Sequence, residues 1–396
     1  MNQAPWYRDG MNRVRFFYLL VQGAFGIYLP FIYIYFAVER GLSGQEIGIL
    51  AAVAPLMTLV VAPVWGAVAD RRGSRLLVLR WVLAGTAAMV LLLGIRDGMQ
   101  LLLPAMGLFA LFQVAIIPLG DGVISAAAAG RNVSYGSLRL WGSLGFAIGG
   151  LLLGQLARWF GMRAIFPVYS LLLLLALPVM WRMIPEEPPP STSTGRGMTI
   201  SLLRNRSITL FLAIAGLAAI GITAGYLFLN VFLHSLGASS TLIGAVSATG
   251  ALVEIPLMLW GGRLIQRHRA PIIFAVGAGL FAVGWGLYAQ LQTPAMALVI
   301  QALNGAAMGL LWPAGVTYMA QQVPAERSAT AQSLLSAMMY GFAPLLATQL
   351  AGLVFDKAGA RAVLNFAAVT MVASLMLFTF TRRWVGARSQ EQAGTE

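Results

Sequence analysis

The segment "GAVADRRGSR", residues 66–75, decides the fold, because it joins two long apolar segments by a short charged turn. Gly66 would let the preceding helix pack closely on a neighbour, and Gly73 permits a tight turn. Asp70 can meet a helix N-terminus or an arginine. The basic residues that would hold this turn in the cytoplasm are Arg71, Arg72 and Arg75. The alternative is a solvated loop that only sets topology.

The composition around this turn is that of a membrane protein. The chain has 396 residues, of which 59% are hydrophobic and 10% are charged, whereas soluble domains carry about 25% charged residues. The net charge of +13 comes from residues scattered between apolar runs, which argues against a nucleic-acid surface. No cysteine is present, so disulfides and thiolate metal sites are excluded. The first apolar run reaches Val38 with no cleavage pattern after it, and we expect a retained helix.

A spanning helix needs roughly 20 apolar residues, and the sequence predicts an all-α membrane protein with twelve such helices. Their predicted ranges are 15–38, 45–68, 75–94, 99–124, 137–158, 163–183, 207–233, 240–261, 270–291, 293–320, 328–354 and 361–381. After the sixth, "IPEEPPPSTSTGRG" at 184–197 cannot continue a helix. We therefore expect a six-helix half at 1–183, a cytoplasmic linker at 184–206, and a second six-helix half with a short tail at 207–396.

The basic residues predict the orientation. With both termini in the cytoplasm, 20 of the 26 Lys and Arg residues fall in inside segments, as the positive-inside rule requires. The halves also repeat at an offset of 196 residues: "GFA" at 145–147 recurs at 341–343, and Ile47-Gly48 recurs as Ile243-Gly244. Duplicated halves around a midplane site are typical of secondary transporters.

Two sets of motifs resemble known families. The turn at 66–75 resembles the signature loop of the major facilitator superfamily, in which it acts as a gating latch between the halves; the copy "GRLIQRHR" at 262–269 has Gln266 in place of the aspartate. In addition, "YGSLRLWGSLGFAIGG" at 135–150 and "GIYLPFIYIYF" at 26–36 resemble the lactose permease and phenylpropionate permease group of proton symporters. This resemblance covers most of the first half.

Two carboxylates lie inside predicted spans, Asp121 in "PLGDGVIS" and Glu254 in "GALVEIPLMLWGG". Charged groups at such depth are costly and usually functional, and at the 196-residue offset both are replaced by threonine. Arg139 follows Asp121 by 18 residues, so that adjacent helices could bring the two together. They could clamp the helices as a buried ion pair, or they could bind the hydroxyl or amine groups of a solute.

The permease resemblance implies that Asp121 and Arg139 bind substrate and that Phe146 stacks on it. Glu254 would couple transport to protons, with Asp121 as the second coupling group, because helix ten lacks the histidine and glutamate of the lactose permease. Polar residues inside spans either line a cavity or join helices. The further substrate-binding candidates of this kind are Gln22, Tyr28, Asn304 and Trp312.

These features predict a monomeric secondary transporter in a bacterial-type inner (plasma) membrane, neither an enzyme nor a metal protein. It would use no cofactor, and the proton gradient would drive uptake of a small polar solute such as a sugar, nucleoside or aromatic acid. Its partners would be solute, protons and lipid, with no nucleic acid. Proton-coupled efflux of drugs or metabolites is the first alternative, and a non-transporting receptor or scaffold is the second. An intramembrane aspartyl protease would need a second membrane aspartate, and no other span contains one.

Overall fold

A computed structural model describes residues 5–95, 98–129, 135–181, 201–324 and 327–385. Within these ranges the chain is helical and contains no strand. The longer elements are α1 (Pro5–Tyr28), α3 (Gly44–Val60), α4 (Ala62–Arg72), α5 (Arg75–Ile95), α6 (Met99–Gln113), α7 (Ile116–Ala129), α8 (Tyr135–Phe160), α9 (Ile165–Trp181), α11 (Arg206–Ser235), α12 (Ser240–Arg267), α13 (Ala270–Ala289), α14 (Ala297–Gln321), α15 (Ser328–Ala337) and α16 (Ala343–Val385). The short elements are α2 (Ile32–Ile34), the π-helices η1 (Tyr35–Glu39) and η5 (Met338–Phe342), and the 3-10 helices η2 (Met162–Ala164) and η3 (Pro294–Met296).

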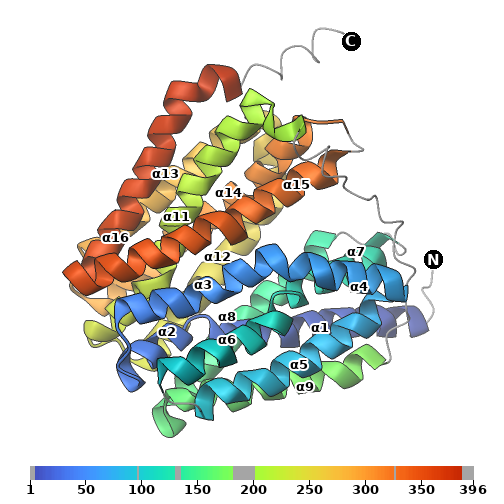
Figure 1. The fold of residues 1–396 in the computed structure, drawn as a ribbon. Helices are drawn as coiled ribbons and strands as arrows, with labels where there is room; N and C mark the ends of the chain where they lie inside the picture. Colours follow the sequence, from blue (N-terminus) through green and yellow to red (C-terminus); the bar gives the residue numbers. More distant parts are fainter. Residues whose placement is uncertain (1–4, 96–97, 130–134, 182–200, 325–326, 386–396) are drawn as a thin grey trace. The chain divides into compact units, whose positions relative to one another are not determined.

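Eleven helical segments of the described chain are long and apolar enough to cross a membrane. The last of them, Ser328–Val385, has 58 residues and is interrupted at Gly359, which has φ 77° and ψ 176°. Because one crossing needs roughly 20 residues, this segment is long enough for two, and the chain turns back within it (Figure 1). The count of twelve spans and the cytoplasmic termini remain predictions.

The chain forms two compact units, residues 1–191 with 233–252, and residues 192–232 with 253–396. The first part of α12 groups with the first unit because its backbone meets that of α8: a Cβ atom on Gly244 would collide with the carbonyl oxygen of Gly150. Most of the predicted linker lies in 182–200, outside the described residues. The division into halves at that linker remains a prediction.

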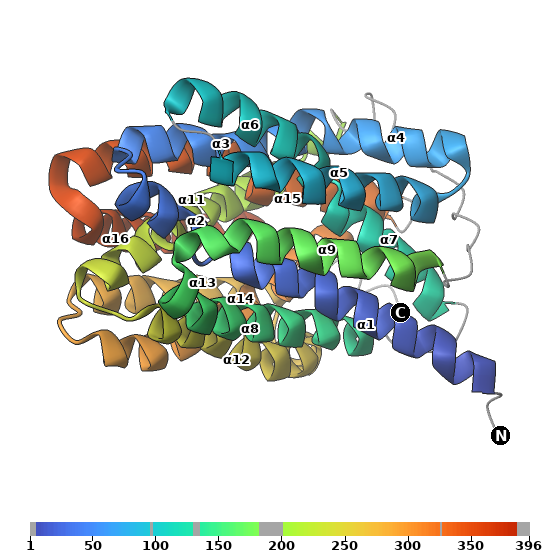
Figure 2. The same cartoon turned by 90° about the horizontal axis from the view of Figure 1, so that it is seen from below.

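In the first unit, glycines bring α1 and α8 into backbone contact (Figure 2). A Cβ atom on Gly145 would collide with the carbonyl oxygen of Leu19, and one on Gly149 with the carbonyl oxygen of Gly23. Apolar helices in lipid associate through such close packing rather than through a hydrophobic force. The contact fixes the rotation of α8 relative to α1, and therefore which side chains of the two helices meet.

A proline breaks the predicted span at 99–124. The span at 99–124 is divided into α6 and α7 at Val114–Ala115, one turn before Pro118, because proline has no N–H to donate to the preceding turn. At this break the N–H of Ala115 donates to Phe112 instead of Leu111. The indole Nε1 of Trp65 on α4 donates to the carbonyl oxygen of Leu111 at 2.7 Å. This carbonyl group, which the break leaves without its helical partner, is thus satisfied, as backbone groups in a membrane span must be.

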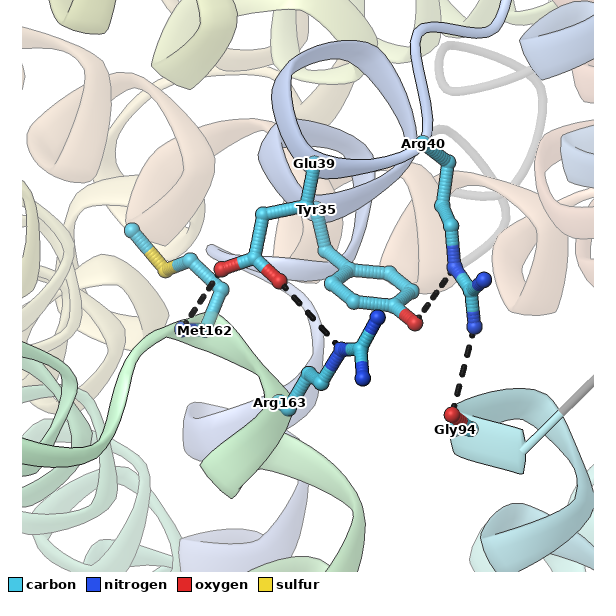
Figure 3. Close-up of polar contacts among 6 residues, drawn as sticks. All are labelled: Tyr35, Glu39, Arg40, Gly94, Met162 and Arg163. Atoms are coloured by element: carbon cyan, nitrogen blue, oxygen red, sulfur yellow. Dashed lines mark hydrogen bonds and ion pairs between the residues drawn. The ribbon is translucent and has the colours of Figure 1, made fainter. Parts of the chain in front are cut away.

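A polar cluster in this unit joins the end of η1, the last turn of α5 and the start of η2 (Figure 3). Arg40, just after η1, donates from Nε to the hydroxyl of Tyr35 at 2.6 Å and from Nη2 to the carbonyl oxygen of Gly94 at 3.2 Å. Gly94 is in the last turn of α5, where carbonyl groups lack helical partners and a cation is favourable. Glu39 accepts a 2.9 Å hydrogen bond from the backbone N–H of Met162 and lies 3.9 Å from Arg163.

The second unit has a turn with nearly the same backbone geometry as a turn of the first unit. Gly161 and Gly359 have nearly the same backbone angles, φ 72° and ψ 177° against φ 77° and ψ 176°, and each is followed two residues later by an arginine. Arg361 donates to the carbonyl oxygen of Leu291, just beyond the end of α13, at 3.3 Å. Arg163 instead lies 3.9 Å from Glu39, so the two turns share their backbone geometry but differ in what their arginines contact. In this unit α13 packs along α14 and α16.

Candidate functional site

Three helices of the first unit bring Tyr18, Asp121 and Arg139 together. The hydroxyl of Tyr18 on α1 donates to Oδ1 of Asp121 on α7 at 2.7 Å. Arg139 on α8 reaches the same hydroxyl from Nη1 at 3.4 Å, and its Nη1 lies 3.9 Å from Oδ2 of Asp121. The predicted approach of Asp121 to Arg139 is thus present, but a tyrosine hydroxyl stands between them.

The accessibility of the three residues differs. Tyr18 is 3% exposed, whereas the side chains of Asp121 and Arg139 are 29% and 31% exposed. A carboxylate offers acceptor oxygens and a guanidinium offers a planar set of donors. The arrangement can therefore bind a molecule that carries both donors and acceptors, such as a polyhydroxylated solute.

Tyr18 was absent from the sequence prediction, although a signal for it was present. It precedes Gln22 by four residues, so both lie on one face of α1. Both side chains pack at Gly142 of α8: a Cβ atom there would lie 2.5 Å from the Tyr18 ring and 3.0 Å from Cγ of Gln22. Gln22, predicted to bind substrate, is thus one helical turn from the site.

Phe146 is seven residues after Arg139 on α8, which places it two turns along the same face, about 10 Å away at the usual helical rise. Its side chain is partly buried, and its backbone carbonyl is where a Cβ on Gly26 would collide. The structure places it on the helix face that carries Arg139. Its stacking role remains a prediction.

Tyr28 lies in the packed interior of the first unit. It is 5% exposed, its hydroxyl lies 3.8 Å from the sulfur of Met106, and its ring contacts those of Phe109 and Tyr169 at centroid distances of 5.1 and 5.5 Å. Tyr28 is ten residues after Tyr18 on the same helix, about 15 Å along it. The structure therefore does not bring Tyr28 to the Asp121 cluster.

The second unit contains the other predicted site residues. Glu254 on α12 is partly buried and lies at a close helix contact, because a Cβ on Gly309 of α14 would be 2.9 Å from its carbonyl oxygen. Trp312 is one turn further along α14 and packs on Tyr340, with ring centroids 5.0 Å apart. Asn304 is fully buried against Gly284 of α13, so in this conformation it is inaccessible to a solute.

The predicted gating turn keeps most of its expected contacts. Gly73 ends α4 in the left-handed region, at φ 65° and ψ 12°, and Asp70 lies 3.8 Å from Arg75. Arg75 also packs at Gly122, where a Cβ would be 3.3 Å from its Nη1, and so connects the turn to the neighbour of Asp121. The expected close packing at Gly66 is wrong for this structure, because no described atom lies within 4 Å of a Cβ built there. Arg71 is exposed.

No group of three potential metal-ligating side chains occurs in the described part of the chain. The described chain has helices long and apolar enough to span a membrane, and an arginine and a carboxylate lie close together among them. Comparison with known families shows which kind of membrane protein has this arrangement. Residues 11–368 match the model of the MFS_1 like family. The chain belongs to this family of the major facilitator superfamily. It is therefore an integral membrane transporter and not an enzyme, as the turn at 66–75 predicts.

Two relatives show the range of this transporter's family. The maltose permease of Geobacillus stearothermophilus is 30% identical over 372 residues, which cover 93% of each chain. The multidrug resistance protein MdtG of Yersinia enterocolitica is 28% identical over 320 residues, which cover 76% of this transporter and 75% of the relative.

Among solved structures, that of the nucleoside transporter NupG superposes with a TM-score of 0.83 at 16% sequence identity, and the match covers 94% of this transporter and 99% of that chain. At this identity the match shows a shared fold and nothing about the solute.

Proposed function

We propose that the transporter takes up a small polar organic solute by alternating access, and that the proton gradient drives it. The observation that carries this proposal is the Tyr18–Asp121–Arg139 cluster, in which both charged groups remain about 30% exposed beside a hydroxyl. A charge pair that served only to join helices would be expected to be shielded from solvent and closely paired. The distance of 3.9 Å between the charged groups is too long for a strong ion pair.

A solute rich in hydroxyl groups fits this cluster best. Hydroxyls both donate and accept, so one molecule can bind the carboxylate and the guanidinium together. The relative named a maltose permease makes sugars the first compounds to test, and nucleosides and aromatic acids follow. Phe146 would provide an apolar face for a ring, and Gln22 would provide an amide one turn from Tyr18.

Glu254 is the proposed coupling carboxylate, with Asp121 as a second candidate. A carboxylate held among apolar helices is costly while it is charged, so gain or loss of a proton changes the energy of the conformation that buries it. The transporter would act as a monomer in a bacterial-type inner membrane, with no cofactor.

The test is a thermal-shift screen of sugars, nucleosides and aromatic acids on purified transporter, followed by counterflow in proteoliposomes with the compounds that stabilise it. Saturable counterflow that an imposed proton gradient converts into uphill accumulation supports the proposal. A compound that binds but is never moved would instead identify a receptor.

Proton-coupled efflux is the second candidate, because the relative named MdtG is a multidrug resistance protein. The direction of solute transport distinguishes efflux from uptake. In inside-out vesicles acidified in the lumen, an efflux antiporter accumulates the solute, whereas a symporter does not.

A further inference from the structure

Asn304 on α14 is a polar residue buried without a hydrogen-bond partner in the second unit. Its side chain is fully buried, and no polar atom of the described chain lies within hydrogen-bonding distance of its Oδ1 or its Nδ2. Burial of an amide without a hydrogen bond costs free energy, and folded proteins keep few such groups. The position of this side chain therefore calls for an explanation.

Asn304 lies on the seam where α14 packs along α13. A Cβ atom on Gly277 would be 2.9 Å from the carbonyl oxygen of Ala307, so the two backbones are close there. Two turns further along α13, a Cβ atom on Gly284 would collide with Oδ1 of Asn304. The amide thus fills the space that this glycine leaves, and the neighbour of its oxygen there is a C–H group, which is only a weak hydrogen-bond donor.

A polar pair one turn away on the same seam does have partners. Gln301 precedes Asn304 by three residues on α14, and Tyr288 follows Gly284 by four residues on α13. The hydroxyl of Tyr288 lies 3.0 Å from Oε1 of Gln301 and 3.0 Å from the carbonyl oxygen of Ala297. The seam can therefore satisfy a buried amide, and in this conformation it satisfies Gln301 and not Asn304.

The helix framework does not require an amide at this position. At the offset of 196 residues, Asn304 corresponds to Leu108. Gly284 corresponds to Ala88. The sister half thus has two apolar residues where the second unit has an amide and the glycine that makes room for it. A costly polar group inside a membrane span that the architecture can do without is a candidate for function.

We propose that Asn304 is a solute-binding group that this conformation withdraws, and that α14 moves relative to α13 to expose it in the opposite conformation. The inference rests on the proposed function, because alternating access supplies the second conformation. Once exposed, the amide can donate to and accept from a hydroxyl group of the solute. Since the unpaired amide destabilises only the conformation that buries it, Asn304 also shifts the equilibrium toward the conformation in which it binds solute.

Thiol labelling tests the exposure of this position. The chain contains no cysteine, so Asn304→Cys introduces a sole thiol. Ser374→Cys is the matched control, because Ser374 is also fully buried in the second unit and its hydroxyl donates to the carbonyl oxygen of Ile214 at 2.8 Å. Both variants are treated in lipid nanodiscs, which leave both faces open, with the small polar thiol reagent methanethiosulfonate ethylammonium. We expect Asn304→Cys to react at least tenfold faster than Ser374→Cys. Equal rates would overturn the inference, because Asn304 would then not be selectively exposed.

The melting temperature tests the cost of burying the amide. Cysteine is similar in size to asparagine and behaves as a small apolar residue, so we expect Asn304→Cys to raise the melting temperature by a few degrees. Ser374→Ala removes a hydroxyl that has a partner and should lower it. A lower melting temperature for Asn304→Cys would show that the amide has a partner in this conformation, and it would overturn the inference. Neither measurement needs a transported solute, so both can fail while the proposed function stands. Absence of counterflow in the unaltered transporter would count against the proposed function alone.

Discussion

The hydroxyl of Tyr18 lies 2.7 Å from Oδ1 of Asp121, across helices that are 103 residues apart in the sequence. The guanidinium of Arg139 is farther from this carboxylate, at 3.9 Å. The first partner of Asp121 is thus neutral, and the carboxylate keeps its charge accessible. This geometry suits a group that must exchange one partner for another during a transport cycle.

Tyr18→Phe should weaken solute binding without unfolding the transporter. The ring still fills the space at Gly142, but Asp121 loses the hydrogen bond that positions its carboxylate for the solute, an interaction with a charged group worth about 1.5–3 kcal/mol. We therefore expect Kd for the transported solute to rise by about tenfold to a hundredfold, measured by isothermal titration in detergent. A Kd equal to that of the unaltered transporter would show that Tyr18 only supports the fold.

Asp121→Asn and Arg139→Leu should abolish measurable solute binding while the melting temperature changes by only a few degrees. The amide oxygen of the asparagine side chain can still accept the hydrogen bond from Tyr18, so the local fold is retained in the first variant. The pair of measurements, binding and melting temperature on the same samples, decides between two roles. Normal binding with a large loss of stability in both variants would identify a helix clamp and remove these residues from the solute site.

Glu254→Gln should retain counterflow exchange and lose proton-driven accumulation. The amide has the size of a protonated carboxyl group, so the helix contact with Gly309 is preserved, but it cannot release a proton. Accumulation against a solute gradient is measured in proteoliposomes with and without an imposed proton gradient. Glu254→Asp keeps a carboxylate at the same position and provides the comparison. Loss of exchange as well as accumulation in Glu254→Gln would mean that this residue binds solute or supports the fold.

The sequence predicted the elements of this site better than its geometry. Apolar length predicted an all-helical membrane protein, and the pair of Asp121 and Arg139 followed from their spacing and from the permease resemblance. The spacing of Tyr18 and Gln22 places both on one face of α1, but it does not place the Tyr18 hydroxyl between Asp121 and Arg139, because that position depends on the rotation that Gly145 and Gly149 impose on α8. The buried positions of Tyr28 and Asn304 were also not foreseen, because the sequence does not show whether a polar residue within a span faces the cavity or the packed interior.

The cluster around Arg40 should contribute to the stability of the first unit. Arg40→Met keeps most of the side-chain volume but removes the hydrogen bonds to Tyr35 and to the carbonyl oxygen of Gly94. Loss of a hydrogen bond to a charged group costs about 1.5–3 kcal/mol, and the last carbonyls of α5 lose a favourable cation. Arg163→Met is the matched control, because its side chain is 66% exposed and exposed ion pairs contribute little. We expect a clearly lower melting temperature for Arg40→Met alone, and equal melting temperatures would argue against a stabilising role.

Gly145→Ala should be the most disruptive of these changes, although it adds a single methyl group. The new Cβ would meet the carbonyl oxygen of Leu19, and since that oxygen is backbone it cannot move aside without separating α1 from α8. Overpacking of this kind costs about 1–3 kcal/mol, and separation of the helices would also draw Tyr18 away from Asp121. Gly107→Ala on α6 is the control, because no described atom lies within 4 Å of a Cβ at that position. Melting temperature and solute Kd should both worsen for Gly145→Ala and stay unchanged for Gly107→Ala. If Gly145→Ala kept normal solute binding, the α1–α8 contact would not be what positions Tyr18.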